Sequence, residues 1–158
     1  MSNELSGSAA ATGTGVSASA FAGARMRSAV DDLVAQIRDI YLADDTPWII
    51  GYSGGKDSTA SLQLVWMALE SLEPGQRHKK VYAVTNDTLV ENPIVVQWVK
   101  LSHRHIEASA AEKGLPVEAH LLHPVVEETF WVNLIGRGYP APNRRFRWCT
   151  ERMKIHPT

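Results

Sequence analysis

The stretch WIIGYSGGKDS, residues 48–58, decides the fold of this chain. Its first residues, Trp48 to Tyr52, are mostly apolar or aromatic and are typical of a short buried strand. A turn through Gly54 and Gly55 follows, and the mostly apolar run from Ser58 to Leu72 indicates a helix packed within the protein. A strand that passes through a glycine turn directly into a helix predicts a βα unit.

The same order recurs along the chain. We expect helices at about 26–41, 58–72, 93–113 and 126–135, strands at 48–52, 80–85 and 116–122, and a loop at 136–147. Asn92 is a good N-cap, Pro93 a good first helical residue and Gly114 a good helix end. One face of that helix holds Ile94, Trp98, Leu101, His105 and Ala108. This alternation predicts an α/β fold of three layers, a doubly wound, mostly parallel sheet with helices on both faces.

Composition limits the organisation and the setting. The chain has 158 residues, enough for one domain, which we place at 25–158, after an arm at 1–24 rich in Ser, Ala, Gly and Thr that we expect to be disordered. The net charge of −1 gives no overall attraction for nucleic acid. One cysteine excludes an internal disulfide. Without a secretory signal or an apolar run of about 20 residues, we expect a cytoplasmic protein and no membrane partner.

The turn at residues 53–58 has the properties of a phosphate-binding loop. Gly54 and Gly55 are expected to take positive φ and to let the backbone approach a ligand, and the loop opens onto a helix N-terminus that favours anions. Ser53, Lys56 and Ser58 add hydroxyl groups and a cation. A Walker A loop is excluded, because three residues rather than four separate Gly51 from Gly55-Lys56, and because Asp57 occupies the position of the magnesium-binding hydroxyl. An ordinary glycine turn with an accidental lysine is the alternative.

The string SGGKDS, residues 53–58, resembles the pyrophosphate-binding loop of the N-type ATP pyrophosphatases, with their adenine nucleotide alpha hydrolase-like fold. This superfamily includes phosphoadenylyl-sulfate reductases, GMP synthetase and tRNA-thiolating enzymes. The resemblance implies that the loop binds ATP and that the protein releases AMP and pyrophosphate. A carboxylate beside phosphates is repulsive, so Asp57 makes sense if it helps to hold Mg²⁺, with Lys56 balancing charge on the phosphates.

The loop after the second predicted strand carries a second resemblance. Residues 87–93, DTLVENP, are similar to the D-T-x-x-x-x-P stretch of phosphoadenylyl-sulfate reductases, which places Asp87 and Thr88 at the nucleotide. The alternative is that both side chains only cap backbone groups. Ile94-Val95 stand where those reductases have a glutamate–threonine pair, so the sequence departs from the reductase pattern there.

Longer strings resemble the DndC family of bacterial DNA phosphorothioation proteins. They are TLVENPIVV at 88–96, TFWVNLIGRGYPAP at 129–142 and RFRWCTERMKI at 145–155. The resemblance implies adenylylation of a non-bridging phosphate oxygen of DNA by ATP, followed by displacement of AMP by sulfur. It also implies a cysteine desulfurase and other phosphorothioation proteins as partners, and a 4Fe-4S cluster.

The C-terminal stretch carries a group of basic residues and the only cysteine of the chain. Its basic residues are Arg137, Arg144, Arg145, Arg147, Arg152 and Lys154. Arginine forks suit the phosphates of ATP or DNA, and we assign Arg147 to the nucleotide; a solvated basic loop is the alternative. Cys149 among these residues suits a cluster ligand or a persulfide carrier, against the alternative of a small buried apolar residue. The six histidines follow no metal-binding spacing, and we interpret them as structural or surface residues.

The family's remaining cysteines lie beyond the equivalent of Thr158, so we expect an N-terminal fragment that binds ATP without completing sulfur transfer alone. Three functions stay open. The first is an ATP pyrophosphatase of DNA phosphorothioation, and the second a phosphoadenylyl-sulfate reductase-like enzyme on a small sulfonucleotide. The third is a nucleotide-binding module without turnover.

Overall fold

Three parallel strands form the centre of the computed structural model, which describes residues 23–158. They are β1 (Trp48–Gly51), β2 (Val81–Asn86) and β3 (Val117–Leu122), paired in the order β1-β2-β3. All three were expected from the sequence, with ends that differ by one residue. Of the predicted N-terminal arm, residues 1–22 lie outside the described residues.

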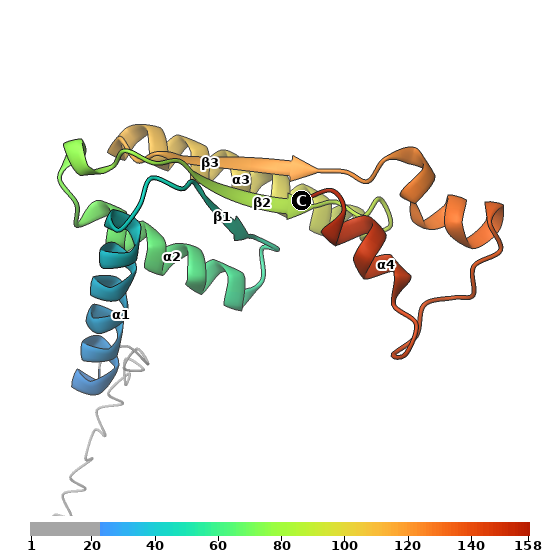
Figure 1. The fold of residues 1–158 in the computed structure, drawn as a ribbon, viewed down its shortest axis with the longest axis horizontal. Helices are drawn as coiled ribbons and strands as arrows, with labels where there is room; N and C mark the ends of the chain where they lie inside the picture. The colour runs from blue at the N-terminus through green and yellow to red at the C-terminus, as the bar shows by residue number, and fades with distance from the viewer. Residues whose placement is uncertain (1–22) are drawn as a thin grey trace, which may run out of the picture.

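Helices alternate with these strands as predicted (Figure 1). The long ones are α1 (Ala24–Leu42), α2 (Lys56–Glu70) and α3 (Pro93–Lys113). The shorter ones are the 3₁₀ turns η2 (Pro74–Gln76) and η3 (Val126–Glu128), the π-helical turns η4 (Val132–Gly136) and η5 (Glu151–Ile155), and α4 (Trp148–Thr150). The single helix expected at 126–135 is therefore broken into two turns of different pitch. None of the described helices is long and apolar enough to cross a membrane.

The ends of α3 confirm the capping residues read from the sequence. The Asn92 side chain accepts a hydrogen bond from the Ile94 amide at 2.9 Å, and Pro93 occupies the first helical position, where its missing N–H costs nothing. Gly114 ends the helix in the left-handed conformation at φ 60°. The capping residues at its two ends therefore mark where this helix begins and ends.

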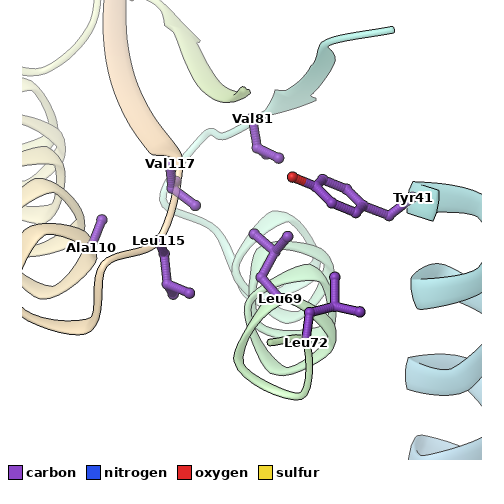
Figure 2. Packing of buried hydrophobic residues seen from close by; sticks show 7 residues of the cluster. All are labelled: Tyr41, Leu69, Leu72, Val81, Ala110, Leu115 and Val117. Atoms are coloured by element: carbon purple, nitrogen blue, oxygen red, sulfur yellow. The ribbon is translucent and has the colours of Figure 1, made fainter. Parts of the chain in front are cut away.

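The main core joins α1, α2 and the sheet around Tyr41 (Figure 2). The Tyr41 ring is buried with Leu69, Leu72 and Val81, and its hydroxyl donates to the Lys79 carbonyl at 2.7 Å. The same hydroxyl accepts from the Lys79 amide at 3.0 Å, so the buried polar atom is satisfied twice. This packing anchors α2, whose first turn carries the glycine loop.

The predicted second layer of helices is missing from the described part of the chain. Residues of α2 and α3 pack in the same clusters as Ile50, Val81 and Ala83, which share one face of the sheet. Strands added in sequence order by right-handed crossovers place successive helices on the same face, and only a reversal of strand order places them on both. On the other face, Ile49 is 59% exposed. The prediction of three layers is therefore wrong for residues 23–158, while the α/β class with a parallel sheet is confirmed.

One expectation about helix burial also needs correction. Helix α2 buries Leu62, Ala68 and Leu69, but its opposite side, with Gln63 and Met67, faces solvent, so it lies on the surface of the protein. The apolar face of α3 formed by Ile94, Trp98, Leu101, His105 and Ala108 is exposed as well. Helix α3 instead buries Val99, His103 and Ala110 against the sheet.

The C-terminal segment, from about residue 126 onward, lies beyond the arrowheads of β2 and β3 (Figure 1). Its own core is Trp148, whose ring stacks on Phe130 at 5.5 Å and meets Tyr139 edge-on at 5.6 Å. Asn86, the last residue of β2, donates to the Lys154 carbonyl at 2.9 Å. The segment is therefore attached at the edge of the sheet where ligands bind in parallel α/β folds.

Candidate nucleotide site

The glycine loop lies between the carboxyl end of β1 and the first turn of α2. Ser58 Oγ closes it, accepting from the Ser53 amide at 3.2 Å and donating to the Gly55 carbonyl at 3.1 Å. The hydroxyl oxygens of Ser53 and Ser58 are 3.1 Å apart. The two serines predicted to contact phosphate thus hold the loop in a compact turn.

The loop presents unpaired backbone donors. Within residues 23–158 the next amide after that of Ser53 to find an acceptor is that of Thr59, which bonds to the Gly55 carbonyl at 3.0 Å. The donors left without an acceptor are the N–H groups of Gly54, Gly55, Lys56, Asp57 and Ser58. No side chain caps the helix at Gly55. Consecutive free amides at a helix N-terminus are favourable for an anion with several oxygens, such as pyrophosphate.

The backbone conformation requires glycine at only one of the two glycine positions. Gly54 has φ 72°, which confirms the predicted positive φ. Gly55 has φ −83° and ψ 167°, an extended conformation open to any residue, so the same prediction is wrong for Gly55. A Cβ at Gly55 would meet only Ser53 Oγ, at 3.4 Å, so the protein itself leaves room for a side chain there.

Lys56 and Asp57 form an ion pair at the mouth of the loop. Lys56 Nζ lies 2.7 Å from Asp57 Oδ1, and both side chains are almost fully exposed. Such a pair contributes little to stability, because water solvates both charges well. The carboxylate and the ammonium are therefore free to separate and meet a ligand.

The side chains of Asp87 and Thr88 form hydrogen bonds within their own loop, which follows β2. Asp87 Oδ1 accepts from the Leu89 amide at 2.9 Å, and the Thr88 hydroxyl donates to Glu91 Oε1 at 3.2 Å. Both residues are buried. Between them and Glu91, Leu89 takes φ 61°, unusual for a residue with a side chain. This geometry favours the backbone-capping role that the sequence left open for Asp87, whereas Thr88 bonds to a side chain. A role of either residue in nucleotide binding stays a prediction.

Sequence reasoning missed His123, which lies beside Asp87. Its Nε2 is 3.6 Å from Asp87 Oδ2. Strands β2 and β3 pair with Asn86 opposite Leu122, and the Asp87 amide donates to the Leu122 carbonyl. Asp87 and His123, which directly follow β2 and β3, therefore lie side by side. Strand register was the signal that could have found this pair, whereas the spacing of histidines along the chain could not.

A buried hydrogen-bond chain fixes the residue before the loop. The Thr85 hydroxyl donates to the Tyr52 carbonyl, and His103 Nε2 lies 2.8 Å from the same hydroxyl oxygen. Because the one hydroxyl proton goes to Tyr52, His103 Nε2 must carry the hydrogen that it donates to Thr85. The Tyr52 amide donates to the Val84 carbonyl at 2.7 Å. His103 confirms the prediction of a structural histidine, and it supports the strand end from which the loop departs.

Burial lowers the pKa of His103, with a smaller opposing effect from Glu107 and a lowering one from His120. A histidine whose folded pKa lies below its unfolded value stabilises the fold fully above about pH 6.5, and that contribution is lost as pH falls from there towards the folded pKa. We expect the free energy of unfolding in urea to decrease between pH 7.5 and pH 5.5. In His103→Gln, which keeps an N–H donor for Thr85, this decrease should be smaller. An unchanged decrease in the variant would assign the pH dependence to other groups.

The basic cluster of the C-terminal stretch is split. Arg152 binds both oxygens of Glu128, at 2.6 and 2.7 Å, and Arg137 bonds to Asn133 at 3.3 Å, so these two arginines hold the segment together. By contrast, the side chains of Arg144, Arg145 and Arg147 are exposed and make no ion pair or hydrogen bond among residues 23–158. No such bond joins Arg147 to the glycine loop either, so its predicted contact with a nucleotide stays a prediction.

The residues present fit the two predicted metal groups differently. Mg²⁺ on a nucleotide needs only one or two protein carboxylates besides phosphate oxygens and water, and the exposed Asp57 meets that need. A 4Fe-4S cluster needs four thiolates, and Cys149, half-buried beside Trp148, is the only cysteine of the sequence. This chain alone therefore does not supply a cluster site.

The described residues thus bring together the glycine loop, the Asp87 loop and the end of β2 at one edge of the sheet. Compared with models of known protein families and with curated proteins, the chain matches none, so its function must be argued from this edge.

Proposed function

We propose that this protein binds ATP at residues 53–58 and cleaves it to AMP and pyrophosphate, as the ATP-consuming component of a DNA sulfur-modification system. The observation that carries the proposal is the row of free N–H groups from Gly54 to Ser58, placed at a helix N-terminus beyond a parallel strand. The β- and γ-phosphates would accept these hydrogen bonds, with Lys56 compensating their charge.

The chemistry follows from where the loop holds the nucleotide. Amides that grip the terminal phosphates stabilise them as a departing pyrophosphate and leave the α-phosphorus open to attack. Asp57 would hold the magnesium ion, which supplies further neutralisation of the leaving charge. An oxygen of a DNA phosphate would attack the α-phosphorus and expel pyrophosphate, and a sulfide-level sulfur nucleophile would later attack the DNA phosphorus and expel AMP.

Contacts to DNA would come from the exposed tip of the C-terminal segment. Arg144, Arg145 and Arg147 lie within four positions of one another and have no partner among the described residues. Guanidinium forks bind phosphate oxygens in pairs, and a local cluster compensates for an overall charge of −1. The resemblance to the DndC family supports DNA rather than a small sulfonucleotide as the acceptor.

A nucleotide-binding module without turnover is the second candidate. It is favoured by the internal bonds of Asp87 and Thr88, which leave the glycine loop as the main contact for a nucleotide.

Incubation of the full chain with ATP labelled at the α-phosphate, Mg²⁺, a short DNA duplex and hydrosulfide as the sulfur nucleophile tests the proposal. We expect labelled AMP and unlabelled pyrophosphate, separated by thin-layer chromatography. Formation of ADP and phosphate would contradict the assignment of the loop. Tight binding of ATP with no product would establish the second candidate instead.

A further inference from the structure

The indole of Trp98 stands against the glycine loop from the neighbouring helix. A Cβ built on Gly54 would lie 3.3 Å from both Cδ1 and Nε1 of Trp98, and 3.6 Å from Cγ2 of Val99. Cδ1 and Nε1 are therefore the indole atoms nearest to the position of that Cβ. This is a contact between α3 and the turn after β1, which are far apart in sequence.

Packing does not explain the position of Trp98. Its side chain is 59% exposed, whereas Val99, the next residue, is buried and carries the contact between α3 and the sheet. The indole N–H has no hydrogen-bond acceptor within residues 23–158. By comparison, Trp66 Nε1 donates to Glu70 and Trp148 Nε1 donates to the Pro140 carbonyl. Trp98 thus keeps a free donor at the surface.

Free donors from two elements meet at this point. The amides of Gly54 and Gly55 lack acceptors, and the Trp98 N–H lies beside the same glycine. An indole N–H can only donate, so it suits an acceptor-rich ligand and no cation. A Cβ at Gly54 would require the ring to shift by a few tenths of an ångström, so the glycine allows this close approach as well as the positive φ of the turn.

We propose that Trp98 belongs to the phosphate site and that its Nε1–H donates a hydrogen bond to a phosphate oxygen of the nucleotide held by residues 53–58. The inference rests on the proposed nucleotide binding and adds a residue that the loop resemblance does not include. Trp98 would fix the orientation of the bound phosphates from the side of α3. It is a binding residue and takes no proton.

The variant Trp98→Phe tests the donor while an aromatic ring stays in place. Phenylalanine keeps a smaller aromatic ring against Gly54 and removes the N–H group together with part of the indole, and the high exposure of the site leaves folding unaffected. The matched control is Trp131→Phe, since Trp131 is 57% exposed and lies in the C-terminal segment. Binding of inorganic pyrophosphate with Mg²⁺ is measured by isothermal titration calorimetry on the full chain, for all three proteins.

A lost hydrogen bond to a charged acceptor predicts binding about tenfold weaker in Trp98→Phe, with Trp131→Phe equal to the original protein. Equal affinity of Trp98→Phe and the original protein would overturn the role of Trp98 and leave the loop assignment intact. Failure of the original protein to bind either pyrophosphate or ATP would overturn both the inference and the proposed function. Trp98→Phe and Trp131→Phe each replace one exposed indole and differ only in its position. The other three of the five tryptophans therefore need not be changed.

Discussion

Replacing Asp57 with asparagine is expected to lower AMP formation by about 10²–10³-fold, because the proposed role of this carboxylate is to hold the metal ion that neutralises the leaving pyrophosphate. Asparagine has nearly the same shape but no charge. The side chain is 88% exposed, so the fold has no reason to change. Initial rates of AMP release from α-labelled ATP measure the effect.

The same substitution separates binding from turnover. In the structure Asp57 holds Lys56 Nζ at 2.7 Å, so removing the charge releases the ammonium for the phosphates. We therefore expect metal-free ATP to bind to Asp57→Asn at least as tightly as to the original protein, while turnover is lost. A general loss of binding would indicate damage to the loop rather than loss of a metal ligand.

The control for Asp57→Asn is Asp45→Asn. Asp45 is also an exposed carboxylate, with His78 Nε2 at 3.0 Å from its Oδ1, but it precedes β1 and lies at the opposite end of the strand from the loop. AMP formation should be unchanged in this variant. Normal AMP formation in Asp57→Asn, with the same metal requirement, would exclude the carboxylate from the proposed chemistry.

Local signals predicted the elements of the fold, and tertiary contacts decided how they pack. Asn92, Pro93 and Gly114 end α3 through interactions with neighbouring backbone groups. The few residues at each end of the helix were therefore enough to predict where it begins and ends. The buried face of α3 could not be read in this way. Apolar residues occur on both of its sides, and the contact with the sheet buries Val99 rather than Trp98.

The number of layers could not be predicted because it depends on strand order. A sequence of alternating strands and helices is compatible with helices on one face or on both, and the pairing β1-β2-β3 places α2 and α3 together. Strand register likewise brings His123 to Asp87, although the chain separates them widely. Pairing between distant strands leaves no trace in the local pattern of either one.

The site was predicted best where its chemistry is local. The residues from Ser53 to Ser58 form a turn with free amides as expected, since glycines and a helix start are adjacent in the sequence. The arginines show the opposite case. Nothing in the string around Arg152 distinguishes it from Arg147, yet Arg152 pairs with Glu128, and only the folded chain places that carboxylate within reach.

Replacing Leu69 with alanine is expected to cost about 2–5 kcal/mol of the free energy of unfolding. Leu69 is fully buried on α2, in one cluster with Tyr41 of α1 and Val81 of β2 (Figure 2). Truncation removes apolar contacts and leaves a cavity that these neighbours cannot fill, because Tyr41 is held by its two hydrogen bonds to Lys79. A domain stability of about 5–15 kcal/mol makes this a large loss.

Urea unfolding followed by circular dichroism measures the effect of Leu69→Ala, with Met67→Ala as the matched control on the same helix. Met67 is 42% exposed, so its truncation should cost less than about 1 kcal/mol. Equal losses from both variants would contradict the packing of α2 against Tyr41 and Val81. The result also concerns the nucleotide site, since α2 carries Lys56 and Asp57 in its first turn and owes its position to this core.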